Sequence, residues 1–308
     1  MDQAEQLRNI IKANNAMNQP TGNVPKRPLA RVITVTSGKG GVGKSNTAIN
    51  LAIQFRKMGQ KVIILDADFG LANIEIMFGA VPKHNLCDLI YQGKNIKDII
   101  TWGPMEVGFI SGGSGIQELA RMTKEQVIYL TQKLVELDSM ADVIIVDTGA
   151  GIADNVLEFV TASSEVLLVA TPEPTSITDA YALLKALNRR AGFSRERTSI
   201  KMISNRVGSE AEGRSLYEKM SVVVDKFLNI QPEFLGIIPQ DDSISKAVMV
   251  QKPITIAYPN SQAAKAMQLI AAKLCNGAET EVRKGITGLF SDMIRTKFRK
   301  ARSKKEGE

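Results

Sequence analysis

A glycine-rich loop at residues 38–45 constrains the fold of this chain more than any other stretch. Its sequence, Gly-Lys-Gly-Gly-Val-Gly-Lys-Ser, fits the phosphate-binding pattern G-x-x-x-x-G-K-S/T. The apolar run 32–36 precedes the loop, and apolar residues at helical spacing follow it from 46 to 58. In this setting of strand, loop and helix, the glycines allow successive backbone N–H groups to point at a polyphosphate. A chance match in a chain of this length has a probability on the order of a per cent, so the loop predicts nucleotide binding.

The loop side chains predict how the nucleotide is held. Lys44 supplies a positive charge for the phosphates, and Ser45 supplies a hydroxyl for Mg²⁺. The residues expected to contact the nucleotide in this region are Gly38, Lys39, Gly40, Gly41, Val42, Gly43, Lys44, Ser45 and Asn46.

An acidic residue follows each of two further predicted strands. The apolar stretch 61–65 ends at Asp66-Ala67-Asp68, and the stretch 143–146 ends at Asp147. Open α/β sheets bind ligands at the carboxyl ends of their strands, and in phosphate-loop enzymes a second strand supplies the acid that holds Mg²⁺, usually through water. An aspartate after a buried strand is often structural, but its combination with the loop favours the Mg²⁺ role for Asp147.

Two later strand ends are candidates for contact with the base or the ribose. Asn205 follows the predicted strand 199–204, and Pro239 and Asp241 follow 234–238. Residues at such positions also cap helices, and position alone leaves both interpretations open.

Strands alternate with helices through most of the chain. Predicted strands at 106–110 and 166–170 and predicted helices at 176–190 and 209–228 continue the pattern. This alternation predicts a doubly wound α/β domain with a mainly parallel sheet, which we place at residues 31–280. The composition, 44% hydrophobic and 23% charged, is that of a soluble globular protein.

Several classes of protein are excluded by what the sequence contains. The chain has two cysteines, Cys87 and Cys275, and one histidine, His84. This excludes a zinc cluster and any Ser-His-Asp machinery that uses a second histidine. The sequence has neither a signal peptide nor an apolar run of membrane-spanning length, so we expect a cytoplasmic protein.

The N-terminal residues are set apart from the main domain. Residues 1–16 are predicted to form a short helix with apolar positions 7, 10 and 11 on one face. Residues 17–30 contain three prolines and few apolar residues, which predicts a flexible linker. From the residues alone, a frayed terminus is as good an interpretation as a functional helix.

The C-terminal residues 281–308 form a predicted amphipathic helix with a basic tail. Of the net charge of +7, the residues from Arg283 onward carry +6, so the basic balance belongs to this segment. Such a helix either docks on the protein's own core or lies in a membrane interface. We favour the membrane, because each Lys or Arg near an anionic surface contributes about 1 kcal/mol. The side chains expected to enter the membrane are Ile286, Leu289, Phe290, Met293, Ile294 and Phe298.

The phosphate loop and the two acidic strand ends together resemble the MinD/ParA family of P-loop ATPases, over about residues 31–275. Lys39, directly after Gly38, is similar to the extra lysine of that family's deviant loop, and segments 66–68 and 147–151 are similar to its two switch segments. The resemblance implies hydrolysis of ATP and an ATP-dependent homodimer in which Lys39 contacts the phosphates of the partner subunit. It also implies that Asp68 positions the attacking water. The implied catalytic residues are Lys39, Lys44, Asp66 and Asp68, and the implied Mg²⁺-binding residues are Ser45, Asp66 and Asp147.

The N-terminal sequence narrows the resemblance to the FlhG (FleN/YlxH) group of this family. Asp2-Gln3-Ala4 followed by Leu7-Arg8 is similar to that group's activating motif. The resemblance implies control of flagellar number and placement, stimulation of the GTPase FlhF through Gln3, and contacts with C-ring proteins and a flagellar transcription activator. It also implies a slow, regulatory ATPase on the inner face of the cell membrane. The polar tail 301–308 departs from the pattern and leaves the boundary of the membrane-binding part open.

Other functions are compatible with the same loop. A DNA partition ATPase of the ParA type would use the basic tail on duplex DNA and would bind less tightly as salt rises. A cell-division regulator of the MinD type shares the chemistry, and a scaffold that only holds nucleotide would show no turnover. The nitrogenase iron protein is disfavoured because Cys87 and Cys275 stand outside the switch segments. We expect no specific nucleic-acid partner.

Overall fold

The structure, a computed structural model, describes residues 29–68, 73–112, 123–228, 230–277 and 284–293 of the 308-residue chain. The predicted N-terminal helix with Gln3, most of the predicted linker, and the apolar residues Ile294 and Phe298 lie outside the described residues.

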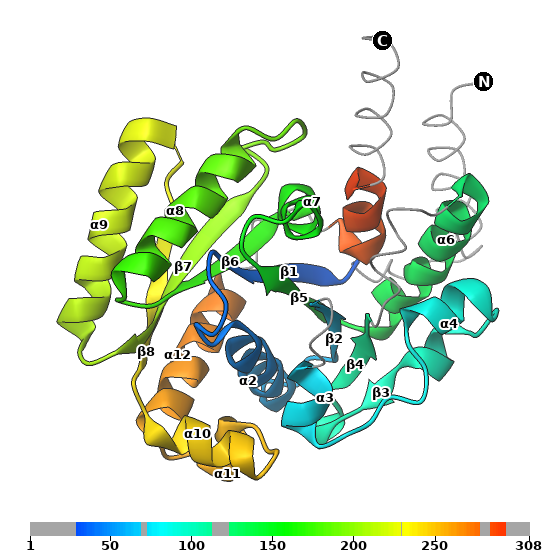
Figure 1. Cartoon of the computed structure of the whole chain (residues 1–308). Helices are drawn as coiled ribbons and strands as arrows, with labels where there is room; N and C mark the ends of the chain where they lie inside the picture. Colours follow the sequence, from blue (N-terminus) through cyan, green and yellow to red (C-terminus); the bar gives the residue numbers. More distant parts are fainter. Residues whose placement is uncertain (1–28, 69–72, 113–122, 229, 278–283, 294–308) are drawn as a thin grey trace.

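An eight-stranded sheet runs through the middle of the domain in the order β3-β4-β2-β5-β1-β6-β7-β8 (Figure 1). Its neighbouring strands are parallel, except for the antiparallel pair β3 and β4. The strands are β1 Arg31–Ser37, β2 Val62–Ala67, β3 Thr101–Trp102, β4 Gly108–Ser111, β5 Val143–Ala150, β6 Glu165–Ala170, β7 Ser199–Val207 and β8 Glu233–Pro239. The predicted mainly parallel, doubly wound sheet is therefore confirmed, and the short edge strand β3 is an addition that the sequence pattern does not predict.

The central strands are apolar throughout because both of their faces are covered. Successive side chains of a strand point to opposite faces, so Ile33 of β1 packs on one side of the sheet and Val32 on the other. Ile145 and Ile144 of β5 divide in the same way. Strands buried on both faces carry continuous apolar runs rather than an alternating pattern.

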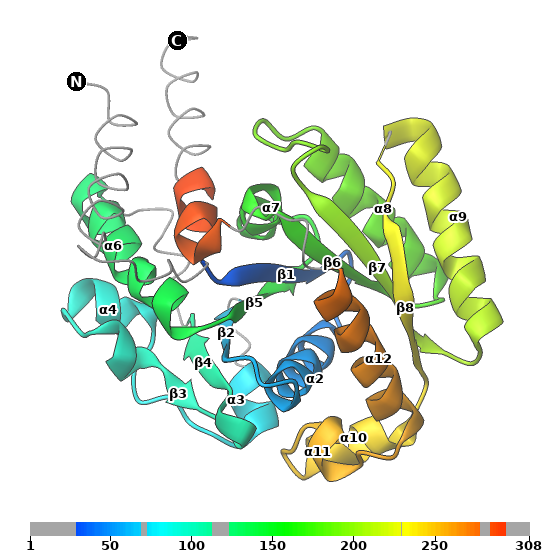
Figure 2. The same ribbon diagram turned by 180° about the vertical axis from the view of Figure 1, so that it is seen from behind.

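Helices cover both faces of the sheet (Figures 1 and 2). Helices α2, α3, α11 and α12 contribute to the cluster on one face, together with residues of α10. Helices α4, α6, α7, α8 and α9 contribute to two clusters on the opposite face. The helices are α2 Lys44–Lys57, α3 Asn73–Phe78, α4 Leu86–Tyr91, α6 Lys124–Met140, α7 Asp154–Ala162, α8 Pro174–Asn188, α9 Glu210–Leu228, α10 Asp242–Met249, α11 Ile254–Ala257 and α12 Gln262–Asn276, and the short 3₁₀ helices are η1 Ile96–Ile99 and η2 Pro104–Glu106.

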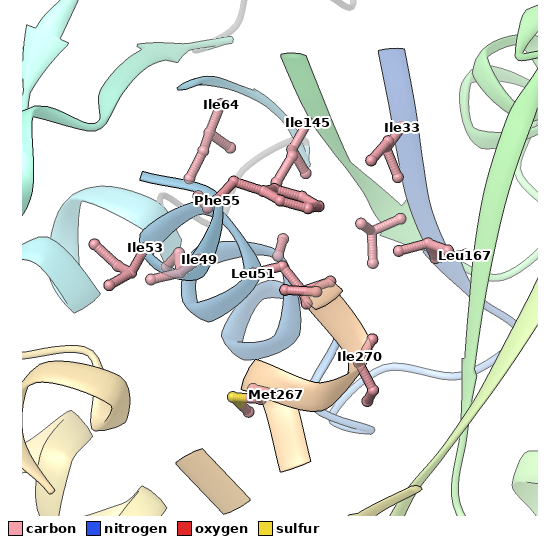
Figure 3. Packing of buried hydrophobic residues seen from close by; sticks show 14 of the residues in the cluster. Ile33, Ile49, Leu51, Ile53, Phe55, Ile64, Ile145, Leu167, Met267 and Ile270 are labelled. Carbon is pink, nitrogen blue, oxygen red and sulfur yellow. The ribbon is translucent and has the colours of Figure 1, made fainter. Parts of the chain in front are cut away.

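Helix α2, which follows the phosphate loop, lies in the deepest part of the core. Figure 3 shows Phe55 against the strand residues Ile64 and Ile145, with Met267 and Ile270 of α12 on the other side of the helix. Burial of each large apolar side chain contributes roughly 1.5–3 kcal/mol. The first residues of α2, and with them the phosphate loop, are therefore held firmly at the carboxyl end of β1.

The described part of the C-terminal amphipathic helix, residues 285–293, packs on the protein's own core. Ile286, Leu289, Phe290 and Met293 are all buried, in the same cluster as residues of α6 and α7. The ring of Phe290 meets that of Phe159 of α7 edge to face, with centroids 5.9 Å apart. In this conformation the four predicted membrane-contacting side chains are covered, so contact with a membrane requires the helix to leave its docked position.

None of the helices in the described part of the chain has the length and apolar character needed to cross a bilayer.

Candidate functional site

The phosphate loop joins β1 to α2, and two of its glycines are required by their surroundings. A Cβ on Gly38 would overlap the backbone of α8 at Asp179 and Ala180. Gly43 has φ of 91°, a left-handed conformation that side chains disfavour, and a Cβ there would overlap the amide of Asn205. The loop is thus packed between α8 and the end of β7, and only glycine fits at these two positions.

Lys44 is the centre of a cluster of charged groups under the loop. Its Nζ lies 2.8 Å from Oδ1 of Asp147 and 3.8 Å from Oδ2 of Asp68. It also lies 3.4 Å from the hydroxyl of Ser45. Asp66 joins the cluster because β2 and β5 are adjacent and parallel, with Asp66 directly opposite Asp147 in the register. The structure therefore brings together four of the side chains predicted to hold Mg²⁺ or to act in catalysis, namely Lys44, Asp66, Asp68 and Asp147, with the hydroxyl of Ser45 alongside.

The carboxylates of this cluster carry more negative charge than one lysine can neutralise. Burial, reinforced by the charge of Asp147, raises the pKa of Asp66 to about 7, although the N–H of Asp68 and the charge of Lys44 lower it in part. Burial also raises the pKa of Asp68, against the lowering effect of Lys44. A site of this kind favours an additional cation, because each carboxylate is held close to others in a poorly hydrated position.

The residues present fit Mg²⁺ bound together with a nucleotide. The Oδ2 atom of Asp147 is buried and has no hydrogen-bond partner among the residues that the structure describes. A buried oxygen of this kind needs a ligand, a water or a metal. Within the described ranges no three acidic, histidine or cysteine side chains form a complete metal cage. Mg²⁺ usually keeps several waters and is bound by one or two carboxylates together with substrate phosphates, and Asp147 with the hydroxyl of Ser45 would hold it here.

Lys39 contacts a different part of the molecule from Lys44. Its Nζ lies 2.9 Å from Oε2 of Glu173 and 2.9 Å from the hydroxyl of Thr175, at the start of α8. The hydrogen bond and the charge of Lys39 hold the pKa of Glu173 below its usual range. The Lys39 side chain is 37% exposed, so it remains accessible from outside the domain. Neither Glu173 nor Thr175 is among the residues predicted for the site; the one sequence signal is that both follow the predicted strand 166–170 at the same edge of the sheet.

Three predicted nucleotide contacts have structural partners within the chain. Asn205 donates from Nδ2 to the carbonyl oxygen of Val42 at 2.6 Å, which ties the end of β7 to the phosphate loop. Asn46 accepts from Nδ2 of Asn50 at 2.9 Å. Asp241 caps α10 by accepting from the N–H of Ser243 and also accepts from the N–H of Ala263. For Asp241 the helix-cap interpretation is thus confirmed, and contact of Asn205 with the base stays a prediction.

Pro239 lies at the same edge of the sheet as Asn205. It ends β8, where it pairs with Val207, and Asn205 pairs with the preceding Ile238. The two strand ends are therefore neighbours at the edge of the sheet where open α/β sheets bind ligands, and contact of Pro239 with the base stays a prediction.

Comparison with known proteins places the chain in a family of P-loop NTPases. The family described as "ParA: NUBPL iron-transfer P-loop NTPase" matches residues 28–275. The antiactivator FleN of Pseudomonas aeruginosa is 43% identical over 244 residues, which cover 79% of this chain and 86% of that protein. The flagellum site-determining protein YlxH of Helicobacter pylori is 31% identical over 299 residues, covering 96% of this chain and 98% of that protein.

Solved structures share the fold. The cell division ATPase MinD of Pyrococcus furiosus superposes with a TM-score of 0.63 at 24% identity, covering 80% of this chain and 99% of that one. The septum site-determining protein MinD of Pyrococcus horikoshii, solved in complex with Mg-ADP, has a TM-score of 0.62 at 24% identity, covering 80% and 96%.

Proposed function

This chain belongs to the MinD/ParA family of P-loop ATPases, in its FlhG (FleN/YlxH) group, and from that premise we propose that it is an ATP-driven switch that dimerises, binds the membrane and controls flagellar number and placement. The observation that carries the proposal is the separation of the two loop lysines. Lys44 is buried among the carboxylates of its own site, whereas the Lys39 side chain is partly exposed and contacts Glu173 at the start of α8. One lysine thus serves the nucleotide within the subunit, and the other is available to a second subunit.

The buried cluster supplies the chemistry of hydrolysis. Lys44 would contact the β- and γ-phosphates once the nucleotide draws it from Asp147, and the hydroxyl of Ser45 with Asp147 and Asp66 would hold Mg²⁺. Bound Mg²⁺ neutralises charge on the transferring phosphoryl group. Asp68 is the most exposed of the three carboxylates, with 19% of its side chain accessible. This exposure supports the proposal that the Asp68 carboxylate orients the attacking water.

Dimerisation would follow from the exposed lysine. To reach the phosphates of a second subunit, Lys39 must exchange Glu173 and Thr175 for phosphate oxygens. The nucleotide then forms part of the contact between two copies of the chain related by a two-fold axis. Hydrolysis removes the γ-phosphate from that contact and so favours monomers.

Membrane binding would be controlled by the number of helices that reach the surface. One short amphipathic helix is a weak and reversible anchor. Two helices on one dimer make the second insertion intramolecular, which raises the avidity by about 10²–10⁴-fold. In this proposal ATP recruits the protein to the inner face of the membrane, and hydrolysis releases it.

Sedimentation with anionic liposomes tests the switch. The intact chain, the Asp68→Ala variant and a chain that ends at Gly285 are each incubated with ATP or with ADP. We expect pelleting with ATP only for the intact chain, prolonged pelleting for Asp68→Ala because it retains ATP, and none for the shortened chain. If Asp68→Ala hydrolyses ATP at the normal rate, the role proposed for Asp68 is wrong. If the intact chain instead shifts duplex DNA at low salt and does not bind liposomes, a DNA partition function replaces the membrane switch.

The N-terminal residues would engage the flagellar partners. Stimulation of the GTPase FlhF through Gln3, and contacts with C-ring proteins and a flagellar transcription activator, are proposed from the resemblance to the FlhG group. Gln3→Ala should abolish stimulation of FlhF GTPase activity and leave ATP turnover intact; stimulation that survives the substitution would contradict the assignment.

A further inference from the structure

We propose that the Asp138 carboxylate, at the end of α6, is a latch that holds the C-terminal helix in its docked position and links that position to the start of β1. The N–H of Ala30, immediately before β1, also contacts this carboxylate, from outside the helix's own segment and at the start of the domain. The inference rests on the proposed function only in treating release of this helix as the event that permits membrane binding.

The latch consists of hydrogen bonds to the first turn of the C-terminal helix. The N–H of Ile286 donates to Oδ1 of Asp138 at 2.8 Å. The N–H of Thr287 donates to Oδ2 at 3.3 Å, and the Thr287 hydroxyl donates to the same oxygen at 2.7 Å. The first N–H groups of a helix have no partner within the helix and are normally capped by a nearby side chain. Here the cap comes from a residue 148 positions away from Ile286, so the helix is capped only while it is docked.

The contact is closely fitted to glycine. Gly285 has φ of 67°, and a Cβ at this position would overlap the carboxylate of Asp138. Any other residue at 285 would push the helix away from α6. Glycine at this position therefore permits both the left-handed turn into the helix and the close approach of the carboxylate.

The same carboxylate also accepts a hydrogen bond from the backbone N–H of Ala30, the residue immediately before β1. Ala30 is buried in the same hydrophobic cluster as the C-terminal helix. One side chain of α6 thus holds both the start of β1 and the start of the C-terminal helix. When the helix leaves, the carboxylate loses three hydrogen bonds, water reaches it, and the remaining bond to Ala30 is weakened.

The environment of Asp138 makes these hydrogen bonds important. Burial raises the pKa of Asp138, and the hydroxyl and N–H groups of Thr287, the N–H of Ile286 and the N–H of Ala30 offset part of that increase. Lys284, directly before the helix, is paired with Asp292 at 3.1 Å. While the helix is docked, these donors compensate for the burial of the carboxylate, so Asp138 and the docked helix stabilise one another.

Hydrogen–deuterium exchange on the full nucleotide-free chain tests the latch. The two regions to compare are residues 284–293 and residues 29–31. Asp138→Asn, which replaces one acceptor oxygen with a donor, should accelerate exchange in 284–293 by about tenfold. Thr287→Val should accelerate it by a few-fold, and Thr287→Ser, which keeps the hydroxyl, should behave as the wild type.

Asp88→Asn is the matched control. The Asp88 carboxylate accepts from the N–H of Asn85 in the capping box of α4, which is a helix cap elsewhere in the domain. The substitution should accelerate exchange in α4 and leave residues 284–293 unchanged. If Asp138→Asn and Thr287→Val both leave exchange in 284–293 unchanged, the latch is overturned.

The link to the N-terminal side is tested in the same experiment. Release of the helix uncovers Ala30 in Thr287→Val and Asp138→Asn alike, because Ala30 lies in the same cluster, whereas Asp138→Asn also alters the acceptor of the Ala30 N–H. At matched exchange in 284–293, we therefore expect faster exchange at Ala30 in Asp138→Asn than in Thr287→Val. Exchange that rises in 284–293 but not at Ala30 refutes the link and leaves the cap. Liposome binding by Asp138→Asn in the presence of ATP is the separate measurement for the membrane function. If the helices are released and the ATP-bound protein still binds no liposomes, the proposed function is contradicted and the latch is unaffected.

Discussion

At the scale of single residues, the chemistry of this protein depends on which carboxylates are left without a cation. Asp147 is paired with Lys44 at 2.8 Å, whereas Asp66 is buried opposite it and shares that lysine only at a distance. The resulting rise of the Asp66 pKa to about 7 means that this residue titrates in the neutral range when nucleotide and Mg²⁺ are absent. The ionised Asp66 thus lowers the stability of the nucleotide-free protein, and a bound metal ion would compensate for its negative charge.

Replacement of Asp66 by asparagine should therefore stabilise the nucleotide-free protein at high pH. The pKa of Asp66 is about 7 in the folded state, against an ordinary value of 3.8 that holds in the unfolded state. Between these two pH values the folded state binds more protons than the unfolded state does. The free energy of unfolding therefore falls as the pH rises through this window. Asp66→Asn removes this effect: the gain is absent near pH 4 and reaches up to about 4 kcal/mol above pH 7. Urea unfolding in EDTA at pH 4.5 and pH 8 measures it.

The exposed residue Glu210, paired with Arg214 on α9, provides the control for this pH series. Glu210→Gln should have the same small effect at both pH values. A gain from Asp66→Asn that is equally large at pH 4.5 would show that ionisation of Asp66 is not its cause.

At the scale of elements, the phosphate loop depends on the helix that follows it. The side chains of α2 are buried along most of its length because the sheet lies on one side and α12 on the other (Figure 3). Asn50 of α2 also accepts hydrogen bonds from the N–H and hydroxyl of Thr255 in α11. The loop is held in place because it leads into a helix that packs on the sheet, α11 and α12.

Truncation of the largest α2 side chain should be strongly destabilising. Phe55 is fully buried, so Phe55→Ala leaves a cavity and should lower the free energy of unfolding by about 3–5 kcal/mol. Phe227→Ala on α9 is the matched control, since that ring is 64% exposed and its loss should change stability by less than about 0.5 kcal/mol. Equal losses from the two substitutions, in denaturant unfolding, would contradict the packing described for α2.

At the scale of the whole molecule, the C-terminal helix belongs to the core as well as to the proposed membrane anchor. It fills the hydrophobic cluster between α6 and α7 (Figures 1 and 2). Leaving this position uncovers apolar surface on the domain and on the helix together. Release therefore has a free-energy cost, which dimerisation and the membrane would supply together in the proposed switch.

The cost of undocking can be measured on one aromatic contact. Phe290 is buried against Phe159, so Phe290→Ala should lower the free energy of unfolding of the monomer by about 3–5 kcal/mol if the helix is docked in solution. Met249→Ala, at a position that is 85% exposed, is the control. No loss of stability from Phe290→Ala in urea unfolding would mean that the helix is undocked in the free monomer.

Much of the fold follows from the sequence because the signals are local. The helices predicted at 176–190 and 209–228 correspond to α8 and α9, and the strand predicted at 106–110 corresponds to β4. The edge strand β3 has only two residues, which is too short for a sequence pattern to predict. The turn after it places Met105 and Glu106 in the left-handed region, where a glycine would normally be the sequence signal. Arg56 of α2 stabilises that turn through Glu106, a contact that no local pattern reveals.

The sequence by itself determined the nucleotide loop, the order of strands and helices, and the acidic residues at strand ends, because each is encoded by neighbouring residues. Only the tertiary structure decided what those residues contact. Lys44 meets a carboxylate 103 positions away, Lys39 one 134 positions away, and Thr287 one 149 positions away. An apolar stripe on a helix specifies that a partner surface is needed but not which one, so the docking of residues 286–293 depended on the apolar residues that α6 and α7 bring together.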